Sequence, residues 1–137
     1  DTYVLIIANE HYNDIVGVVP FAENDGTIFR QYCIQTLGIP ERQIRFTIDA
    51  TRNQVVDGLD WIDNIAQARK GAAKFIVYYA GHGIENEGIN YLLPIDIGSI
   101  TQEDVPFYAI SLDYVLQQMS YAKAKTNIMI LDSNKKE

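Results

Sequence analysis

The chain has 137 residues, of which 47% are hydrophobic, and this length and average composition suit one globular domain, residues 1–137, rather than a disordered chain. Its formal net charge of −7 argues against binding to nucleic acid or to an anionic membrane, because both need clustered lysine and arginine. The single cysteine excludes an internal disulfide and a cysteine-based zinc site.

The first predicted elements are a buried strand at residues 3–8 and a helix at residues 23–37. The strand is a short β-branched run bounded by the polar segment NEHYND. No secretory leader precedes it and no apolar run is long enough to cross a bilayer, so we expect a cytoplasmic protein. The helix ends before Gly38 and Pro40. Its predicted apolar stripe comprises Ile28, Phe29, Cys33 and Leu37. On this stripe Cys33 is expected to be a core residue and not a nucleophile.

A second strand at residues 44–48 and a second helix follow. Thr51 with Gln54 three residues later is a capping-box pattern, which predicts that the helix begins here. Its expected buried face comprises Val55, Leu59, Ile62, Ile65 and Ala66. A third strand is predicted at residues 74–80 and a polar, mobile loop, GIENEGIN, at residues 83–90.

The last third of the chain predicts a short extended segment at residues 91–94, a helix and a fourth strand. Ser111 is a suitable N-cap for a helix that runs through Leu112, Val115, Leu116 and Met119. The apolar run at residues 127–132, NIMILD, predicts the fourth core strand.

Four apolar strands that alternate with amphipathic helices predict an α/β fold. We expect a three-layer sandwich in which a mostly parallel sheet is covered by helices on both faces. Functional residues gather at the carboxyl ends of parallel strands. The residues expected at those ends are Asn9 to His11, Asp49, Gly81 to Gly83, and Asp132 to Asn134.

The stretch VYYAGHG places His82 between two glycines after the third strand. Paired glycines indicate that the chain turns sharply or that another group approaches the backbone closely. Two interpretations of His82 stay open, a structural histidine and a general base at a strand tip. In the second, the amide of Gly83 is a candidate oxyanion donor. His11 has only its position in favour of function, and we interpret it as a loop residue. Tyr78 and Tyr79 are expected to pack in the core.

Five segments, YYAGHG, PFAENDGTIF, IDATRNQVVDGLDWI, YLLPID and IMILD, together resemble the caspase and metacaspase superfamily of cysteine peptidases, family C14, and in particular its bacterial members. In that family a strand ends in His-Gly and a later strand ends in Asp-x-Cys. The sequence LDSN places Asn134 where the cysteine is expected, 52 residues after His82.

The resemblance implies that the chain is the large-subunit portion of a peptidase domain with a Cys-His dyad. His82 would move the proton, and the amides of Gly83 and residue 134 would hold the oxyanion. A small half outside this sequence would complete the sheet of six strands. Because Asn134 has no thiol, we expect the chain as given to be inactive. A natural pseudoenzyme, an engineered inactive form and a joined tail are three explanations that stay open.

The resemblance also implies a substrate pocket with Asp25 and Asp132 at its base, which would select arginine or lysine in a peptide or protein substrate. We expect no metal or other cofactor. Calcium is a weaker alternative, since some metacaspases use it. The acidic residues considered for it are Glu85, Glu87, Asp96, Glu103 and Asp104, which we interpret as a solvated face.

The sequence also offers two rival functions. The first is a pseudoprotease that binds a basic peptide through the same acidic cleft without cutting it. The second is a nucleotide-binding domain of flavodoxin or Rossmann type, which suits the alternation of strands and helices. The first turn, ANEHYND, excludes the second rival because it offers no glycine-rich phosphate cradle.

Overall fold

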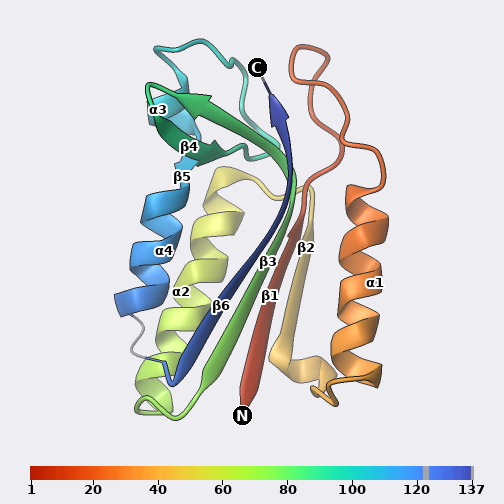
Figure 1. Ribbon diagram of the computed structural model, residues 1–137, viewed down its shortest axis with the longest axis vertical. Coiled ribbons are helices and arrows are strands. Elements are labelled where there is room, and N and C mark those ends of the chain that lie inside the picture. The colour runs from red at the N-terminus through yellow and green to blue at the C-terminus, as the bar shows by residue number, and fades with distance from the viewer. Residues whose placement is uncertain (122–123, 137) are drawn as a thin grey trace.

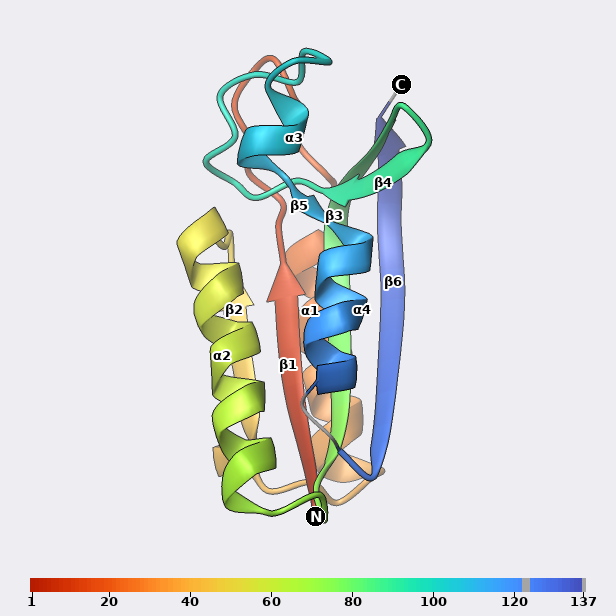
Figure 2. The ribbon, with the colours of Figure 1, turned by 90° about the vertical axis from the view of Figure 1, so that its left-hand side faces the viewer.

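The computed structural model describes residues 1–121 and 124–136, and these form three layers (Figures 1 and 2). A six-stranded sheet lies between α1 on one face and α2 and α4 on the other. The elements are β1 Thr2–Ala8, α1 Ala22–Gln35, the 3-10 turn η1 Glu41–Gln43, β2 Ile44–Ile48, α2 Arg52–Ala68, β3 Lys74–Asn86, β4 Ile89–Leu92, α3 Val105–Tyr108, β5 Ile110–Ser111, α4 Leu112–Tyr121 and β6 Thr126–Lys136. In this described part of the chain, no helix combines the length and apolar character needed to cross a membrane.

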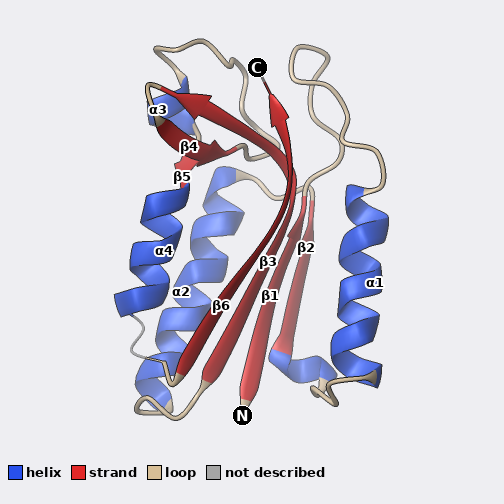
Figure 3. Cartoon of the chain, in the orientation of Figure 1, coloured by secondary structure: helices blue, strands red, loops and turns tan. Residues whose placement is uncertain are grey.

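The strand order is β2-β1-β3-β4-β5, and β6 pairs with β3. β1 lies parallel to β2 and β3, and β6 lies parallel to β3, whereas β4 and β5 are antiparallel additions. The predicted α/β fold with a mostly parallel sheet flanked by helices is therefore confirmed (Figure 3). The four parallel strands are the four core strands that the sequence predicted.

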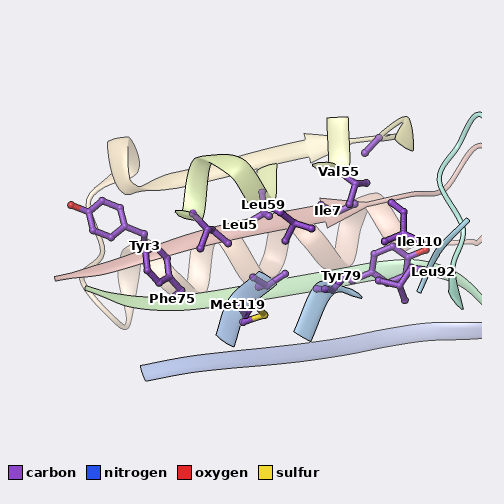
Figure 4. Close-up of a cluster of buried hydrophobic side chains, with 14 of the residues drawn as sticks. Tyr3, Leu5, Ile7, Val55, Leu59, Phe75, Tyr79, Leu92, Ile110 and Met119 are labelled. Carbon is purple, nitrogen blue, oxygen red and sulfur yellow. The ribbon is translucent and has the colours of Figure 1, made fainter. Parts of the chain in front are cut away.

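The sheet buries one hydrophobic cluster on each face. Figure 4 shows the cluster under α2 and α4, where Leu5 of β1 lies near Leu59 of α2 and Phe75 of β3 lies beside Tyr3. On α2 the predicted face is confirmed, since Val55, Leu59, Ile62 and Ala66 are buried and Ile65 is partly buried. The helix begins with the predicted capping box, in which Thr51 and Gln54 exchange side-chain to backbone hydrogen bonds. The sequence predicted this helix correctly because its N-terminal capping box and its apolar face indicate the same helix.

The predicted stripe of α1 is partly wrong. Cys33 is fully buried and Phe29 packs at the edge of the core, but Ile28 is 55% exposed and Leu37 is 47% exposed. The helix instead approaches the sheet over small residues. A Cβ on Gly26 would lie 2.9 Å from the Cβ of Ala8, so the backbone of the helix lies close to β1 at this position.

The third strand is much longer than predicted. β3 continues past residue 80 to Asn86 and returns through β4, so the expected mobile loop at residues 83–90 is a hairpin. Its turn is at Glu87 and Gly88, both of which have positive φ. The polar residues were misleading because backbone pairing with β4 and β6, not apolar side chains, extends this strand.

Candidate active site

Parallel pairing of β3 with β6 brings the predicted residues together. In the register of the two strands, His82 is the partner of Asn134 and Ala80 is the partner of Asp132. Paired residues of parallel strands point to the same face, here the face covered by α1. Figure 1 shows that β3 and β6 run side by side toward the end of the sheet where most of the long loops lie. Residues 82 and 134, distant in sequence, are thus neighbours.

His82 lies inside β3 and is only 4% exposed, so the prediction that it occupies a polar turn is wrong. The first of the two flanking glycines, Gly81, is explained by the other interpretation, close approach of another group. A Cβ on Gly81 would lie 2.6 Å from the hydroxyl oxygen of Tyr79 and 2.9 Å from that of Tyr12. Residue 81 must therefore lack a side chain, because two tyrosine hydroxyls occupy its place.

Both ring nitrogens of His82 face carbonyl oxygens. Nε2 lies 2.9 Å from the carbonyl oxygen of Gly17, and Nδ1 lies 3.2 Å from that of Asn134. A neutral imidazole has one N–H, and the shorter contact assigns it to Nε2. Nδ1 then faces the backbone carbonyl oxygen of residue 134, so the ring lies beside the position where a nucleophile is expected. Sequence reasoning missed Gly17, since no local pattern connects this loop residue to His82.

Gly83 lies between two neighbouring strands. Its Cα partners are Leu92 of β4 and Lys135 of β6. A Cβ at this position would lie 3.4 Å from the carbonyl oxygen of Tyr91 and 3.5 Å from the Cβ of Ser133. These are near-normal contacts, so glycine is less strictly required here than at position 81. The role of its amide as an oxyanion donor stays a prediction.

A cavity of about 270 Å³ opens beside residue 134. Its lining comprises Val19, Pro20, Ala22, Asp25, Ala80, Asp132, Ser133 and Asn134. Asp25, in the first turn of α1, lies with Asp132 of β6 in this lining. Burial, hydrogen bonding to Asp132 and the charge of Asp132 raise the pKa of Asp25. The two predicted pocket acids are therefore close enough to share one proton or one cationic partner.

A shallower groove lies on the other side of the acidic pair. Phe29 and Tyr78 stack there with ring centroids 4.5 Å apart, beside Asp25 and Asp132. The Tyr78 hydroxyl donates a 3.4 Å hydrogen bond to Oδ2 of Asp132. Burial and the two negative charges raise the pKa of Tyr78 to about 12. The hydroxyl consequently remains protonated and available as a donor to the pocket.

The remaining reactive residues lie elsewhere. Cys33 is buried in the cluster beneath α1, and burial raises the pKa of its thiol. His11 is a loop residue, as predicted, with Nδ1 2.9 Å from Oδ2 of Asp49. The hydrogen bond to Asp49 and the charge of its carboxylate raise the pKa of His11.

In the part of the chain that the structure describes, one set of potential metal ligands converges, Glu10, His11 and Glu23, with donor atoms within 4.8 Å of one another. Glu10 also accepts a 3.0 Å hydrogen bond from the amide of Glu23, which ties the loop after β1 to the start of α1. Some of the acids considered for calcium have protein partners. Glu87 accepts from Gln102, and Asp96 accepts from the amide of Arg52.

The fold and the site together define a class of protein. It is a three-layer α/β domain in which a buried histidine on one strand is the register partner of residue 134 on the neighbouring parallel strand. The family comparison agrees, since residues 1–137 match the model of the caspase domain of peptidase family C14. The chain belongs to this family. No curated protein matches it significantly.

Proposed function

We propose that this domain is built to cleave peptides after arginine or lysine, with a thiol at position 134 as nucleophile. The observation that supports this is the pairing of β3 with β6, which leaves Nδ1 of His82 3.2 Å from the backbone carbonyl oxygen of residue 134. In a competent enzyme the thiol gives its proton to Nδ1 and the sulfur attacks the peptide carbonyl carbon. The peptide C–N bond then breaks as His82 returns the proton to the leaving amine. Water finally hydrolyses the thioester.

The oxyanion of the tetrahedral intermediate needs donors beside the nucleophile. Gly83 follows His82 directly in β3, and residue 134 lies opposite in β6. Their amides are the proposed donors, because backbone N–H groups held in a sheet need no reorganisation during the reaction.

The acidic pair supports the choice of a basic residue at P1, the residue before the cleaved bond. Asp25 and Asp132 line the cavity next to residue 134, and the neighbouring Asp132 raises the pKa of Asp25. Ionising both carboxyls at this distance is unfavourable, and a guanidinium or ammonium group between them removes that cost. An acidic side chain would add a third negative charge and is rejected.

Asn134 determines what the chain as it stands does with such a peptide. A carboxamide has no thiol proton to transfer and forms no thioester, so the peptide is bound and not cut. Cys33 is no substitute because it is fully buried beneath α1, away from the cavity. Peptide binding without cleavage is therefore the activity proposed for this form.

The outer edge of β6 supports a partner for this domain. Among the described residues, β6 pairs only with β3, and Ile128 and Leu131 are 45% and 42% exposed. An unpaired, partly apolar edge is unfavourable in water. We propose that the small half of the same domain adds strands here.

The test is a panel of labelled peptides that differ only at P1, carrying arginine, lysine, alanine or aspartate, with binding followed by fluorescence anisotropy. Arginine and lysine should bind and aspartate should not. Asp132→Asn should weaken binding of the arginine peptide about thirtyfold, which corresponds to about 2 kcal/mol of binding free energy. This value is at the low end of the loss expected when one partner of an ion pair is removed, because Asp132 is exposed. Asp60→Asn, an exposed carboxylate on α2, is the matched control.

A preference for aspartate over arginine would overturn the pocket assignment. The nucleophile position is tested separately by Asn134→Cys with the small half supplied. Cleavage should appear, and His82→Ala should lower it by a factor of about a hundred or more. Cleavage that depends on Cys33 would contradict the assignment of position 134.

A further inference from the structure

β3 changes its hydrogen-bond partners just before His82. β1 pairs with it as far as Ala8, opposite Ala80, and the amide of Asn9 makes one more bond to the carbonyl of Ala80 at 2.7 Å. β1 then turns away and provides no backbone acceptor for the next donor on that side, the amide of His82. This amide donates to the hydroxyl oxygen of Tyr12 at 3.1 Å. A side chain thus replaces the missing strand residue.

A second hydroxyl completes the arrangement. The hydroxyl of Tyr79 donates to the carbonyl oxygen of His82 at 2.6 Å, and that of Tyr12 donates to the carbonyl oxygen of Leu93 at 2.7 Å. The two hydroxyl oxygens are 3.2 Å apart. Figure 4 shows Tyr79 at the end of the buried cluster near Leu92 and Ile110. Burial raises the pKa of both tyrosines, so both hydroxyls remain protonated donors.

The loop that carries Tyr12 also holds the ring of His82. The ring of Tyr12 packs on the imidazole with centroids 4.8 Å apart, and Gly17, five residues later, accepts from Nε2 at 2.9 Å. The loop is closed on itself by the hydrogen bond from the amide of Gly17 to the carbonyl of Asn13 at 2.8 Å. The loop therefore contacts the amide, the ring face and Nε2 of His82.

We propose that Tyr12 and Tyr79 are positioning residues for His82. Their hydroxyl pair fixes the backbone of the base where β1 has ended, and so fixes the tautomer and direction of its ring. This inference rests on the proposed function only in naming His82 the base. A pair of phenylalanines would fill the same volume but leave the amide of His82 without an acceptor, and Gly81 shows that the strand has made room for the oxygen atoms.

The experiment uses the chain as it stands, labelled with nitrogen-15. The tautomer and titration of the His82 ring are measured by NMR, together with exchange of its backbone amide. The parent should hold the Nε2–H tautomer. In Tyr12→Phe the share of the Nδ1–H tautomer should rise several-fold, and exchange of the amide should accelerate about tenfold or more. Tyr79→Phe should have a smaller effect, because the carbonyl of His82 keeps its 3.0 Å bond from Leu93.

Tyr3→Phe is the matched control, since this hydroxyl contacts Arg69 at the other end of β1 and should leave His82 unchanged. The proposal is overturned if Tyr12→Phe lowers the unfolding temperature but leaves the tautomer and titration of His82 as in the parent. If Tyr12→Phe does not fold, the proposal is tested with Tyr79→Phe. This variant is expected to fold because both backbone groups of His82 keep a hydrogen-bond partner. An unchanged His82 ring in that variant overturns the proposal.

None of these readouts requires cleavage, so a failure of the proposed peptidase function is seen separately, as an inactive Asn134→Cys form. In a cleaving Asn134→Cys form, Tyr12→Phe should lower kcat about tenfold or more and leave KM unchanged, because a displaced base slows the reaction without weakening peptide binding. An unchanged kcat would contradict the positioning role.

Discussion

The two halves of β3 are held in different ways. Residues 74–80 lie between β1 and β6, with a regular parallel ladder on both sides and apolar side chains such as Phe75 and Val77 in the core. Residues 81–86 lie beyond the end of β1, where tyrosine hydroxyls, loop carbonyls and the short β4 replace that ladder. The regular half contributes apolar burial to stability, whereas the irregular half brings polar groups together at the site.

The difference follows from the lengths of the strands. β1 ends at Ala8, whereas β3 and β6 continue together to Ile84 and Lys136. Backbone donors and acceptors of β3 that lose β1 must find other partners, and the loop after β1 supplies them. A change in the regular half should therefore alter stability without altering His82, whereas a change in the irregular half should alter His82 and cost less stability.

The largest expected effect comes from the regular half. Phe75 is 1% exposed and packs on Tyr3 with ring centroids 5.9 Å apart. Phe75→Ala should lower the free energy of unfolding by about 3–5 kcal/mol, measured by urea denaturation, because it leaves a cavity in the core. The ring titration of His82 in the folded variant should not change. A loss below about 1 kcal/mol would mean that this half is not the stable part of β3.

A smaller effect is expected from Gly81 in the irregular half. In Gly81→Ala the new Cβ would lie 2.6 Å from the Tyr79 hydroxyl and 2.9 Å from that of Tyr12, so the buried tyrosines must move. We expect a loss of about 1–3 kcal/mol in unfolding free energy, the usual range for overpacking, and an altered His82 ring titration.

Gly83→Ala is the matched control for this change, since its nearest contact at 3.4 Å is close to normal. It should cost less stability than Gly81→Ala. Equal losses at the two positions would show that the hydroxyl pair does not account for the glycine at 81.

The sequence predicted the regular half much better than the irregular half. The apolar runs at residues 3–8, 44–48, 74–80 and 127–132 predicted the parallel core because each run is short, β-branched and bounded by polar residues. The prediction failed beyond Ala80. There the strand is maintained by pairing with β4 and β6, and a pattern of side chains carries no information about distant backbone partners.

The site was predicted in part for the same reason. The resemblance implied that residues 82 and 134 act together, and the two are partners in the register of β3 and β6. Tyr12 and Gly17 could not be predicted, because their role depends on where β1 ends and how its loop folds back over β3. Tyr79 was expected only to pack, and it does so with its ring while its hydroxyl binds His82.

The smallest expected effect concerns the acidic pair beside the irregular half. Burial and the neighbouring Asp132 raise the pKa of Asp25 above the ordinary aspartate value of 3.8. The folded state therefore binds this proton more tightly than the unfolded state. Ionised Asp25 lowers stability at neutral pH, and this loss disappears as the pH falls through the raised pKa toward 3.8.

Asp25→Asn should remove that loss, because an amide carries no charge at any pH. At pH 7 the variant should unfold at a higher temperature than the parent. This shift in unfolding temperature should be smaller than the shifts caused by Phe75→Ala and Gly81→Ala. The difference between variant and parent should shrink as the pH falls toward 3.8. Asp60→Asn, on the exposed side of α2, should show no such pH-dependent gain. The same Asp25→Asn substitution removes half of the acidic pair, so a more stable protein should bind the arginine peptide less well. A variant that is less stable than the parent at pH 7 would show that Asp25 supports the fold. The acidic pair at the irregular end of the sheet would then not lower the stability of the protein.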